Sequence, residues 1–271
     1  MKRGWITWDK TELPPSAFES RLAVVRTQLE KADLPALVVY TDVWRSNQGR
    51  YLSNFMPYWN RALLVIPRDS APILLCGLSP RVYPWIRSVT ILEEIRPSTN
   101  LAQQLAQLRT EKDWTKIGVL DLPQIPYDLL VPDAVDISWS AIHPEPDDAE
   151  LAMYRRAAKM AREILAEELP DFSVGSLELK LRRAGAEDVV ILVNDGSISL
   201  AMEYRGHWAK ITRPIETIPS RSTLSKTELL SGPYPWECCQ RADLTPGAIF
   251  AVTDGSTGDT WRLGPEGPEL L

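Results

Sequence analysis

The chain has 271 residues, of which 44% are hydrophobic and 24% charged, and its formal net charge is −6 at pH 7. This composition is typical of a globular protein with enough chain for two domains, and it excludes a disordered chain. Because the net charge is negative and no nucleic-acid-binding motif is present, we do not expect a nucleic-acid partner.

The cysteines and the apolar runs indicate the compartment. The three cysteines, Cys76, Cys238 and Cys239, cannot build a disulfide framework and lack the spacing of a metal or redox motif. For the adjacent pair Cys238 and Cys239, buried or half-buried thiols are favoured over a nucleophile or a metal ligand, because no histidine lies nearby in sequence. No apolar run approaches the ~20 residues that span a bilayer, and residues 1–9 do not resemble a signal peptide. We therefore expect a cytoplasmic protein without a membrane segment.

Helices and strands alternate in the first half of the chain. A Ser-x-x-Glu capping box at Ser16 predicts a helix that continues to about Ala32. The apolar run Leu34–Thr41 predicts a strand buried on both faces. Further strands are predicted at 61–67, 71–77, 89–95, 116–122 and 136–140, helices at 98–111 and 126–131, and a polar loop at 42–49. This alternation predicts an α/β domain over residues 1–142.

A Pro-rich segment, Ala141–Pro146, marks the expected domain boundary, and the second domain is placed at 143–271. His143 lies in this segment and is interpreted as a solvated linker residue. The acidic run Asp147–Glu150 contains a second capping box, which predicts a helix to about Leu169. Capping accounts for these acidic residues better than a carboxylate site does.

The second domain is predicted to be of the α+β class. A helix is expected from 176 to Gly185, where glycine favours a helix end. Strands are expected at 187–193, 198–213 (one or two strands), 248–252 and 260–263, with a short helix at 224–230. The run 255–258 favours a tight turn over a phosphate-binding loop, because no lysine or helix follows it.

The stretch Glu203–Pro214 is the strongest candidate for a site. Its alternation predicts one aromatic-rich strand with a polar face. It carries His207, and only two histidines are present, so imidazole chemistry near neutral pH would use His207 or His143. His207 is therefore the candidate catalytic residue, and a structural or binding role is its preferred interpretation.

Several segments resemble the creatinase/prolidase family. Residues 18–40, 50–55 and 61–67 are similar to its N-terminal domain, and 147–169, 176–186, 204–213 and 244–271 are similar to its pita-bread domain. The resemblance implies a creatinase-type N-terminal α/β domain, followed by a pita-bread domain shortened in its middle. It also implies a homodimer.

The peptidases of this family bind two divalent metals through two Asp, one His and two Glu, and a bridging water attacks the substrate. In this sequence, Lys210 occupies the position of one metal-binding Asp. Thr253 and Gly258 occupy the positions of the two Glu. No histidine follows His207, and the other Asp falls in the shortened region. The resemblance therefore implies no dinuclear metal site and no cofactor.

Two functions remain open. The preferred hypothesis is a degenerate, non-catalytic relative that binds a small anionic metabolite or peptide in the remnant cleft, or that acts as a dimeric partner. The alternative is a metal-independent amidino- or amidohydrolase like creatinase, with His207 moving protons, or an Xaa-Pro peptidase-type hydrolase. The residues expected to bind a ligand are Tyr204, His207, Trp208, Lys210 and Arg213.

Overall fold

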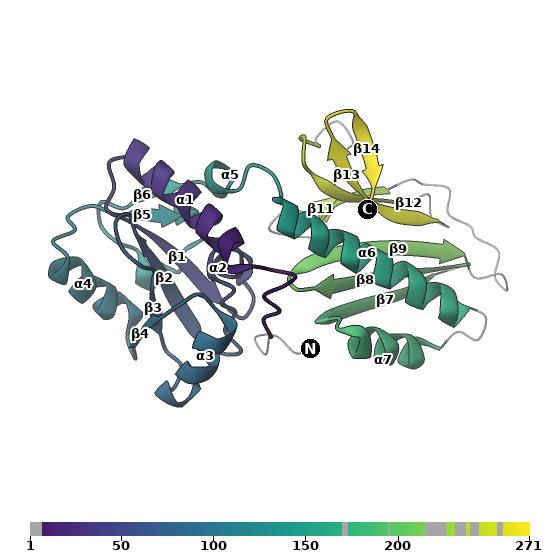
Figure 1. Ribbon diagram of the computed structural model, residues 1–271, viewed down its shortest axis with the longest axis horizontal. Coiled ribbons are helices and arrows are strands. Elements are labelled where there is room, and N and C mark those ends of the chain that lie inside the picture. The colour runs from purple at the N-terminus through teal and green to yellow at the C-terminus, as the bar shows by residue number, and fades with distance from the viewer. Residues whose placement is uncertain are drawn as a thin grey trace. The chain divides into compact units, whose positions relative to one another are not determined.

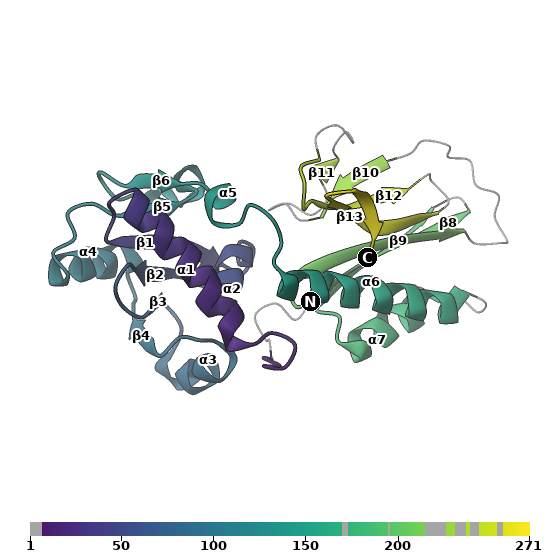
Figure 2. The same ribbon diagram turned by 45° about the horizontal axis from the view of Figure 1, so that its top comes forward.

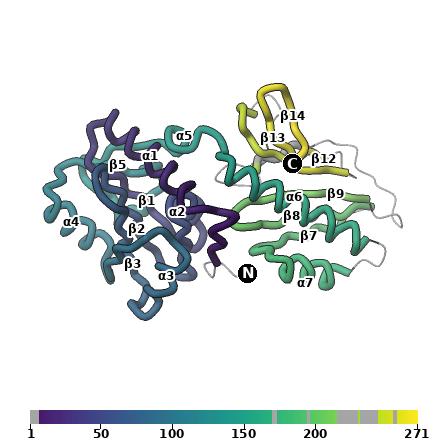
Figure 3. The backbone as a smooth tube through the Cα atoms, viewed as in Figure 1, coloured from purple at the N-terminus to yellow at the C-terminus, as the bar shows by residue number. Residues whose placement is uncertain are grey.

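The computed structural model describes residues 7–169, 173–194, 196–214, 226–230, 237–238, 244–253 and 257–271. The course of the chain can be followed in Figure 3. It divides into two compact units, one ending at Pro144 and the other running from Glu145 to Leu271; the sequence placed the boundary between 142 and 143. The predicted turn residues Gly255 and Ser256 and the thiols of Cys238 and Cys239 lie outside the description.

The first unit is built on a mixed sheet of six described strands in the order β4-β3-β2-β1-β5-β6. The pairs β1–β2 and β2–β3 are antiparallel, and the other pairs are parallel. The strands are β1 Ala36–Asp42, β2 Arg61–Pro67, β3 Ile73–Cys76, β4 Glu94–Pro97, β5 Gly118–Leu120 and β6 Val135–Ile137.

Helices cover both faces of this sheet (Figures 1 and 2). On β1, Leu37 and Val39 belong to the core cluster that includes α1, while Val38 and Tyr40 belong to the cluster that includes α4. The prediction of a strand buried on both faces is confirmed. The helices of this unit are α1 Pro15–Lys31, α2 Asn47–Ser53, α3 Tyr83–Val89, α4 Leu101–Glu111 and α5 Trp139–Ile142, with 3-10 turns at Pro80–Val82, Leu122–Gln124 and Tyr127–Leu129.

Several predictions in this unit are wrong in detail. The capping box expected at Ser16 does not form, because α1 begins at Pro15 and its N-cap residue, Pro14, makes no side-chain hydrogen bond. The helix expected at 126–131 is only the 3-10 turn Tyr127–Leu129, and the loop expected at 42–49 already contains the start of α2 at Asn47. The strand expected at 89–95 is the end of α3 followed by β4, because Pro84 is tolerated in the first helical turn and Ile86 and Val89 pack inward. The helix expected from Ser98 begins later, where the Asn100 side chain accepts the N–H of Gln103. The strand expected at 136–140 ends at 137, and α5 follows it.

His143 is a packed residue and not a solvated one. Its ring stacks on Trp139, with 4.9 Å between centroids and 12° between planes. It also meets Tyr51 edge-to-face at 4.8 Å. Tyr51 is far from His143 in sequence, and Trp139 belongs to a segment that was predicted to be a strand. The sequence therefore showed no sign of these contacts, and the Pro-rich surroundings indicated a linker.

Cys76 lies in β3 and is buried. Burial raises the pKa of its thiol to about 11, although the N–H of Leu78, 3.4 Å from Sγ, partly opposes the shift. A thiol with this pKa is protonated at neutral pH and is a poor nucleophile.

The second unit contains an eight-stranded sheet, in the order β11-β10-β12-β13-β9-β8-β7 with β14 paired to β13, as far as the description extends. Its strands are β7 Asp188–Asn194, β8 Ser197–Tyr204, β9 His207–Pro214, β10 Lys226–Leu229, β11 Glu237–Cys238, β12 Ile249–Thr253, β13 Gly258–Gly264 and β14 Gly267–Leu270. Its helices are α6 Asp148–Glu168 and α7 Val174–Ala184. No described helix is long and apolar enough to cross a membrane.

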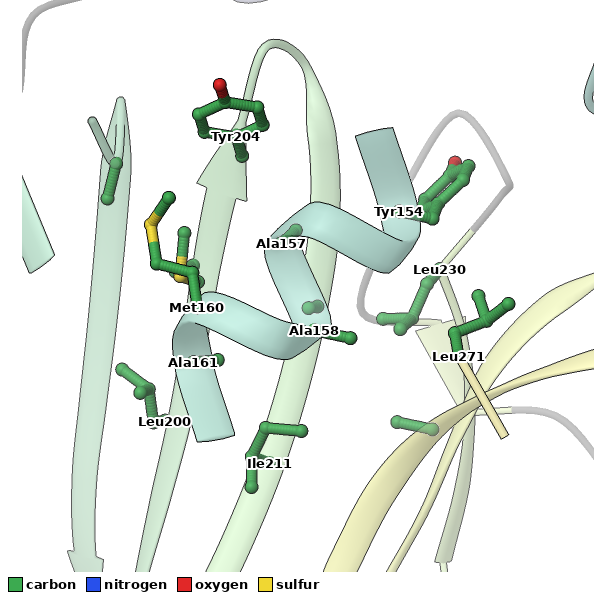
Figure 4. Close-up of a cluster of buried hydrophobic side chains, with 14 of the residues drawn as sticks. Tyr154, Ala157, Ala158, Met160, Ala161, Leu200, Tyr204, Ile211, Leu230 and Leu271 are labelled. Atoms are coloured by element: carbon green, nitrogen blue, oxygen red, sulfur yellow. The ribbon is translucent and has the colours of Figure 1, made fainter. Parts of the chain in front are cut away.

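Helix α6 organises the core of this unit (Figure 4). Its small residues Ala157, Ala158 and Ala161 are fully buried among residues of β8, β9 and β12. The predicted capping box is confirmed, because Asp147 accepts the N–H of Glu150 and the Glu150 carboxylate accepts the N–H of Asp147. The acidic cluster at 147–150 is thus a helix cap.

Two further predictions in this unit are resolved. The end of α7 at Gly185 is confirmed, where φ is +115°, a region that favours glycine. The short helix predicted within 224–230 is wrong, since Lys226–Leu229 forms β10 and pairs with both β11 and β12. Pairing with strands distant in sequence overrides the local helical pattern there.

Candidate functional site

The stretch Glu203–Pro214, expected to be one strand, is a hairpin. Tyr204 pairs directly with His207, and the turn residues Arg205 and Gly206 have φ of +49° and +86°. Two consecutive positive φ values define the type I′ turn that suits a two-residue hairpin. The signal for this turn was Gly206, since an isolated glycine within a strand pattern marks an interruption.

The hairpin separates the five expected ligand-binding residues into two groups. Paired residues share a face and alternate residues change face. Tyr204, His207 and Arg213 therefore lie on the face of the hairpin that packs on α6, together with Ala209 and Ile211. Trp208 and Lys210 lie on the opposite face. The five residues do not form one surface.

His207 contacts the first turns of α6. Its ring meets Tyr154 edge-to-face at 4.8 Å, and its Nδ1 lies 2.9 Å from the carbonyl oxygen of Arg205. Its Nε2 is 3.7 Å from Oε1 of the buried capping residue Glu150. Burial, and next the charge of Glu150, raise the pKa of Tyr154, so this phenol is protonated at neutral pH. The imidazole, only 15% exposed, thus holds the hairpin turn against the helix.

The positions that match metal ligands lie on three adjacent strands. On β9, Thr212 is two residues beyond Lys210 and pairs with Gly258 of β13, which pairs in turn with Thr253 of β12. A Cβ at Gly258 would lie 2.7 Å from the carbonyl oxygen of Val252 and 2.9 Å from Cβ of Thr253. A glutamate there would therefore require a backbone shift.

These residues do not fit a dinuclear metal site. Metals of this kind need carboxylate and imidazole donors that converge, whereas an ammonium repels a cation. The matched positions supply the ammonium of Lys210, the hydroxyl of Thr253 and no side chain at Gly258. Throughout the described part of the chain, no three His, Cys, Asp or Glu side chains gather as a metal-ligand group.

In the described part of the chain, the backbones of β9 and β13 pair only at Thr212 and Gly258. Side-chain hydrogen bonds provide further links between the two strands. The Thr260 hydroxyl, fully buried, accepts the N–H of Lys210 at 2.9 Å and donates to its carbonyl at 3.0 Å. Arg213 Nη1 donates to the carbonyls of Thr212 and Gly258, at 2.8 and 2.7 Å. We call this junction the β9–β13 seam.

A charged cluster lies next to the seam. Asp259 accepts Arg213 Nη2 through one carboxylate oxygen and Arg162 Nη1 through the other, both at 2.9 Å. The latter oxygen also accepts the N–H of Thr260. Two guanidinium groups thus share one carboxylate, which leaves the cluster with one net positive charge. The three side chains are only 15–30% exposed.

A pocket of about 570 Å³ opens beside this cluster. The paired residues Phe250 and Trp261, and Val252 and Asp259, present one face of β12 and β13 to it. Its apolar wall consists of Leu244, Phe250, Val252, Trp261, Leu263 and Pro268. Its polar end consists of Arg213, Thr257, Gly258 and Asp259.

Sequence reasoning found Arg213 but missed Arg162, Asp259 and the apolar wall. The available signal was the composition of β12, where Ile249 and Ala251 alternate with Phe250 and Val252, so that both faces of the strand are apolar. One face enters the core around α6 and the other lines the pocket. A strand with two apolar faces needs a covering for each of them.

Comparisons with solved structures identify the fold. An Xaa-Pro dipeptidase from Bacillus anthracis is similar over 93% of this chain and 97% of its own, with a TM-score of 0.65 and 14% identity. A prolidase from Pyrococcus horikoshii OT3 gives a TM-score of 0.66 at 12% identity, with the same coverage. An X-prolyl aminopeptidase from Caenorhabditis elegans gives 0.59 at 9% identity over 95% of this chain and 60% of its own.

The chain therefore has the two-domain pita-bread fold of prolidases and Xaa-Pro peptidases, and the expected fold class is confirmed. No protein-family model matches the sequence, and no curated protein matches it. At such low identity the similarity establishes the fold, whereas function depends on the residues of the site.

Proposed function

We propose that this chain is a non-catalytic relative of the prolidase-fold enzymes that binds a small anionic metabolite or peptide. The observation that carries the proposal is the set of residues at the matched metal positions. Lys210 replaces a carboxylate by a cation, and the crowding around Gly258 opposes a glutamate at that place. A metal-bound water needs the ligands that these residues do not supply.

The binding part of the proposal rests on the pocket beside Arg213. A concave, mostly apolar site with a few polar groups at one end is typical of small-molecule binding. The net positive charge of the Arg162–Asp259–Arg213 cluster favours an anion. The C. elegans structure is described as that of a cytosolic enzyme, and a cytoplasmic location is part of this proposal.

Metal analysis and an activity assay test the non-catalytic role. We expect the purified full chain, dialysed against manganese, cobalt or zinc, to retain less than stoichiometric metal by mass spectrometry. We also expect it to leave Xaa-Pro dipeptides intact. Stoichiometric metal together with metal-dependent hydrolysis of these dipeptides would overturn the proposal.

One observation favours the metal-independent hydrolase as a second candidate. His207 lies 3.7 Å from the buried carboxylate of Glu150, and a histidine beside a carboxylate is a common proton-transfer pair. The same ring, however, packs against Tyr154 and bonds to the turn carbonyl of Arg205. We therefore assign His207 a structural role, which the second prediction in the Discussion tests.

A homodimer is the partner that we propose, formed through the first unit. Trp44, Trp59 and Tyr127 are 72%, 57% and 90% exposed. They emerge near one another, because Asp42 pairs with Arg61 across β1 and β2 and Arg61 binds Asp128 at 2.9 Å. Exposed aromatic groups of this kind are characteristic of interfaces.

Replacement of these aromatic groups is expected to weaken the dimer. For the double variant Trp59→Ser and Tyr127→Ser, loss of about 3 kcal/mol in total would raise the dimer dissociation constant more than 100-fold. Sedimentation equilibrium measures the constant. Leu179→Ser, an exposed position on α7, is the control and should leave it unchanged. A monomeric wild-type chain would contradict the proposed dimer.

A further inference from the structure

The pocket beside Arg213 has opposite chemical character at its two ends. The pair Val252–Asp259 stands at one end, the pair Phe250–Trp261 in the middle, and Leu263 at the other end. The four residue steps from Asp259 to Leu263 along β13 cover about 13 Å, at about 3.3 Å per residue. An elongated molecule lying along these strands would meet charge at one end and, among the described residues, apolar side chains at the other.

The polar end is suited to a single negative charge. Both oxygens of Asp259 already accept hydrogen bonds from Arg213, Arg162 and the N–H of Thr260. Among the described side chains, one guanidinium charge therefore remains in excess, in a partly buried setting where charge interactions are stronger than in water. A monoanion would balance it, whereas a dianion would leave an excess negative charge next to Asp259.

The rest of the pocket is suited to a hydrocarbon body. Phe250 is 3% exposed, and Trp261, Val252 and Leu263 are half-buried along the same wall. The volume of about 570 Å³ lies within the range of small-molecule sites. Apolar groups of a ligand placed against this wall leave water and contribute to affinity in proportion to the area buried.

We propose that this pocket binds an amphiphilic monocarboxylate, an aliphatic or arylalkyl acid of medium chain length. Its carboxylate lies beside Arg213 at the Asp259 end, and its tail points along β12 and β13 toward Leu263. The inference rests on the proposed binding function and specifies the ligand class and orientation. It depends on Arg162, Asp259 and the apolar wall, to which the sequence resemblance gives no role.

Calorimetry on the full chain with four probes tests the ligand class. Octanoate is expected to bind roughly 15-fold more tightly than hexanoate, because each buried methylene contributes about fourfold. Octanol, which lacks the charge, is expected to bind at least tenfold more weakly than octanoate. Octyl phosphate, with its second charge, should also bind more weakly. Equal binding of octanol and octanoate, or tighter binding of octyl phosphate, would overturn the assignment.

Two variants test the position of the ligand. Arg162 contacts Asp259 but does not line the pocket, so Arg162→Gln removes the excess positive charge without changing the pocket wall. Octanoate affinity should therefore fall at least tenfold, while octanol affinity stays the same. Arg156→Gln, an exposed position on the same helix, is the matched control and should change neither. Leu263→Ala should weaken octanoate more than hexanoate, because only the longer tail reaches it. Thermal unfolding verifies that each variant is folded.

The outcomes separate this inference from the proposed function. If dipeptides or short carboxylates bind but Arg162→Gln and Leu263→Ala have no effect, the pocket assignment is wrong and the binding function stands. If the chain retains metal and hydrolyses Xaa-Pro dipeptides, the non-catalytic function is wrong whatever octanoate does.

Discussion

Replacing Thr260 by valine is expected to lower the free energy of unfolding of the second unit by about 2–4 kcal/mol. Valine has nearly the shape of threonine but cannot accept the N–H of Lys210 or donate to its carbonyl. Both backbone groups would lose this partner at a site from which water is excluded. The cost of an unsatisfied buried group is greater than the net gain from making one hydrogen bond.

Thr260→Ser is the matched control for this variant. Serine keeps the hydroxyl and loses one buried methyl group, so its cost should be about 1 kcal/mol. Urea denaturation measures both values, and amide hydrogen exchange at Lys210 reports the seam directly. Equal destabilisation by serine and valine would mean that packing, and not the pair of hydrogen bonds, holds the seam.

His207→Ala is expected to destabilise the second unit by about 2 kcal/mol. The change removes the edge-to-face contact with Tyr154, which contributes about 0.5–1.5 kcal/mol beyond the area that it buries. It also removes the hydrogen bond to the Arg205 carbonyl in the hairpin turn. Urea denaturation again gives the value.

His207→Asn provides the comparison that separates structure from catalysis. Its amide N–H can take the place of Nδ1–H toward the Arg205 carbonyl, so about half of the lost stability should return. A catalytic imidazole would give another pattern, with hydrolytic activity lost in both variants and stability almost unchanged. That pattern would restore the creatinase-like hydrolase as the leading hypothesis.

Local signals predicted much of the fold. The strand Arg61–Pro67 has the predicted bounds, the capping box at Asp147 forms as expected, and Gly185 ends its helix. Each of these depends on residues within a few positions of one another. The hairpin turn at Arg205 and Gly206 was missed because Arg-Gly is a weaker turn signal than Asn-Gly or Asp-Gly.

The candidate site was predicted only in part. The family resemblance drew attention to Lys210, Thr253 and Gly258, and the structure places them on neighbouring strands. The charged cluster escaped prediction because Arg162 and Asp259 are 97 residues apart, and no spacing rule links two such residues. The apolar wall likewise escaped prediction, because the pairing of β12 with β13 determines which face of β12 lines the pocket, and this pairing exists only in the folded chain.

The β9–β13 seam also has a consequence for the order of folding. The strands β8 and β9 are joined by a two-residue turn, whereas Thr260 meets Lys210 across a sequence separation of 50 residues. Closing a long loop costs conformational entropy before any contact repays it, so distant pairings form slowly. We expect the β8–β9 hairpin to form early on α6 and the seam to close last. The pocket would then be absent from any folding intermediate and appear only with the native state.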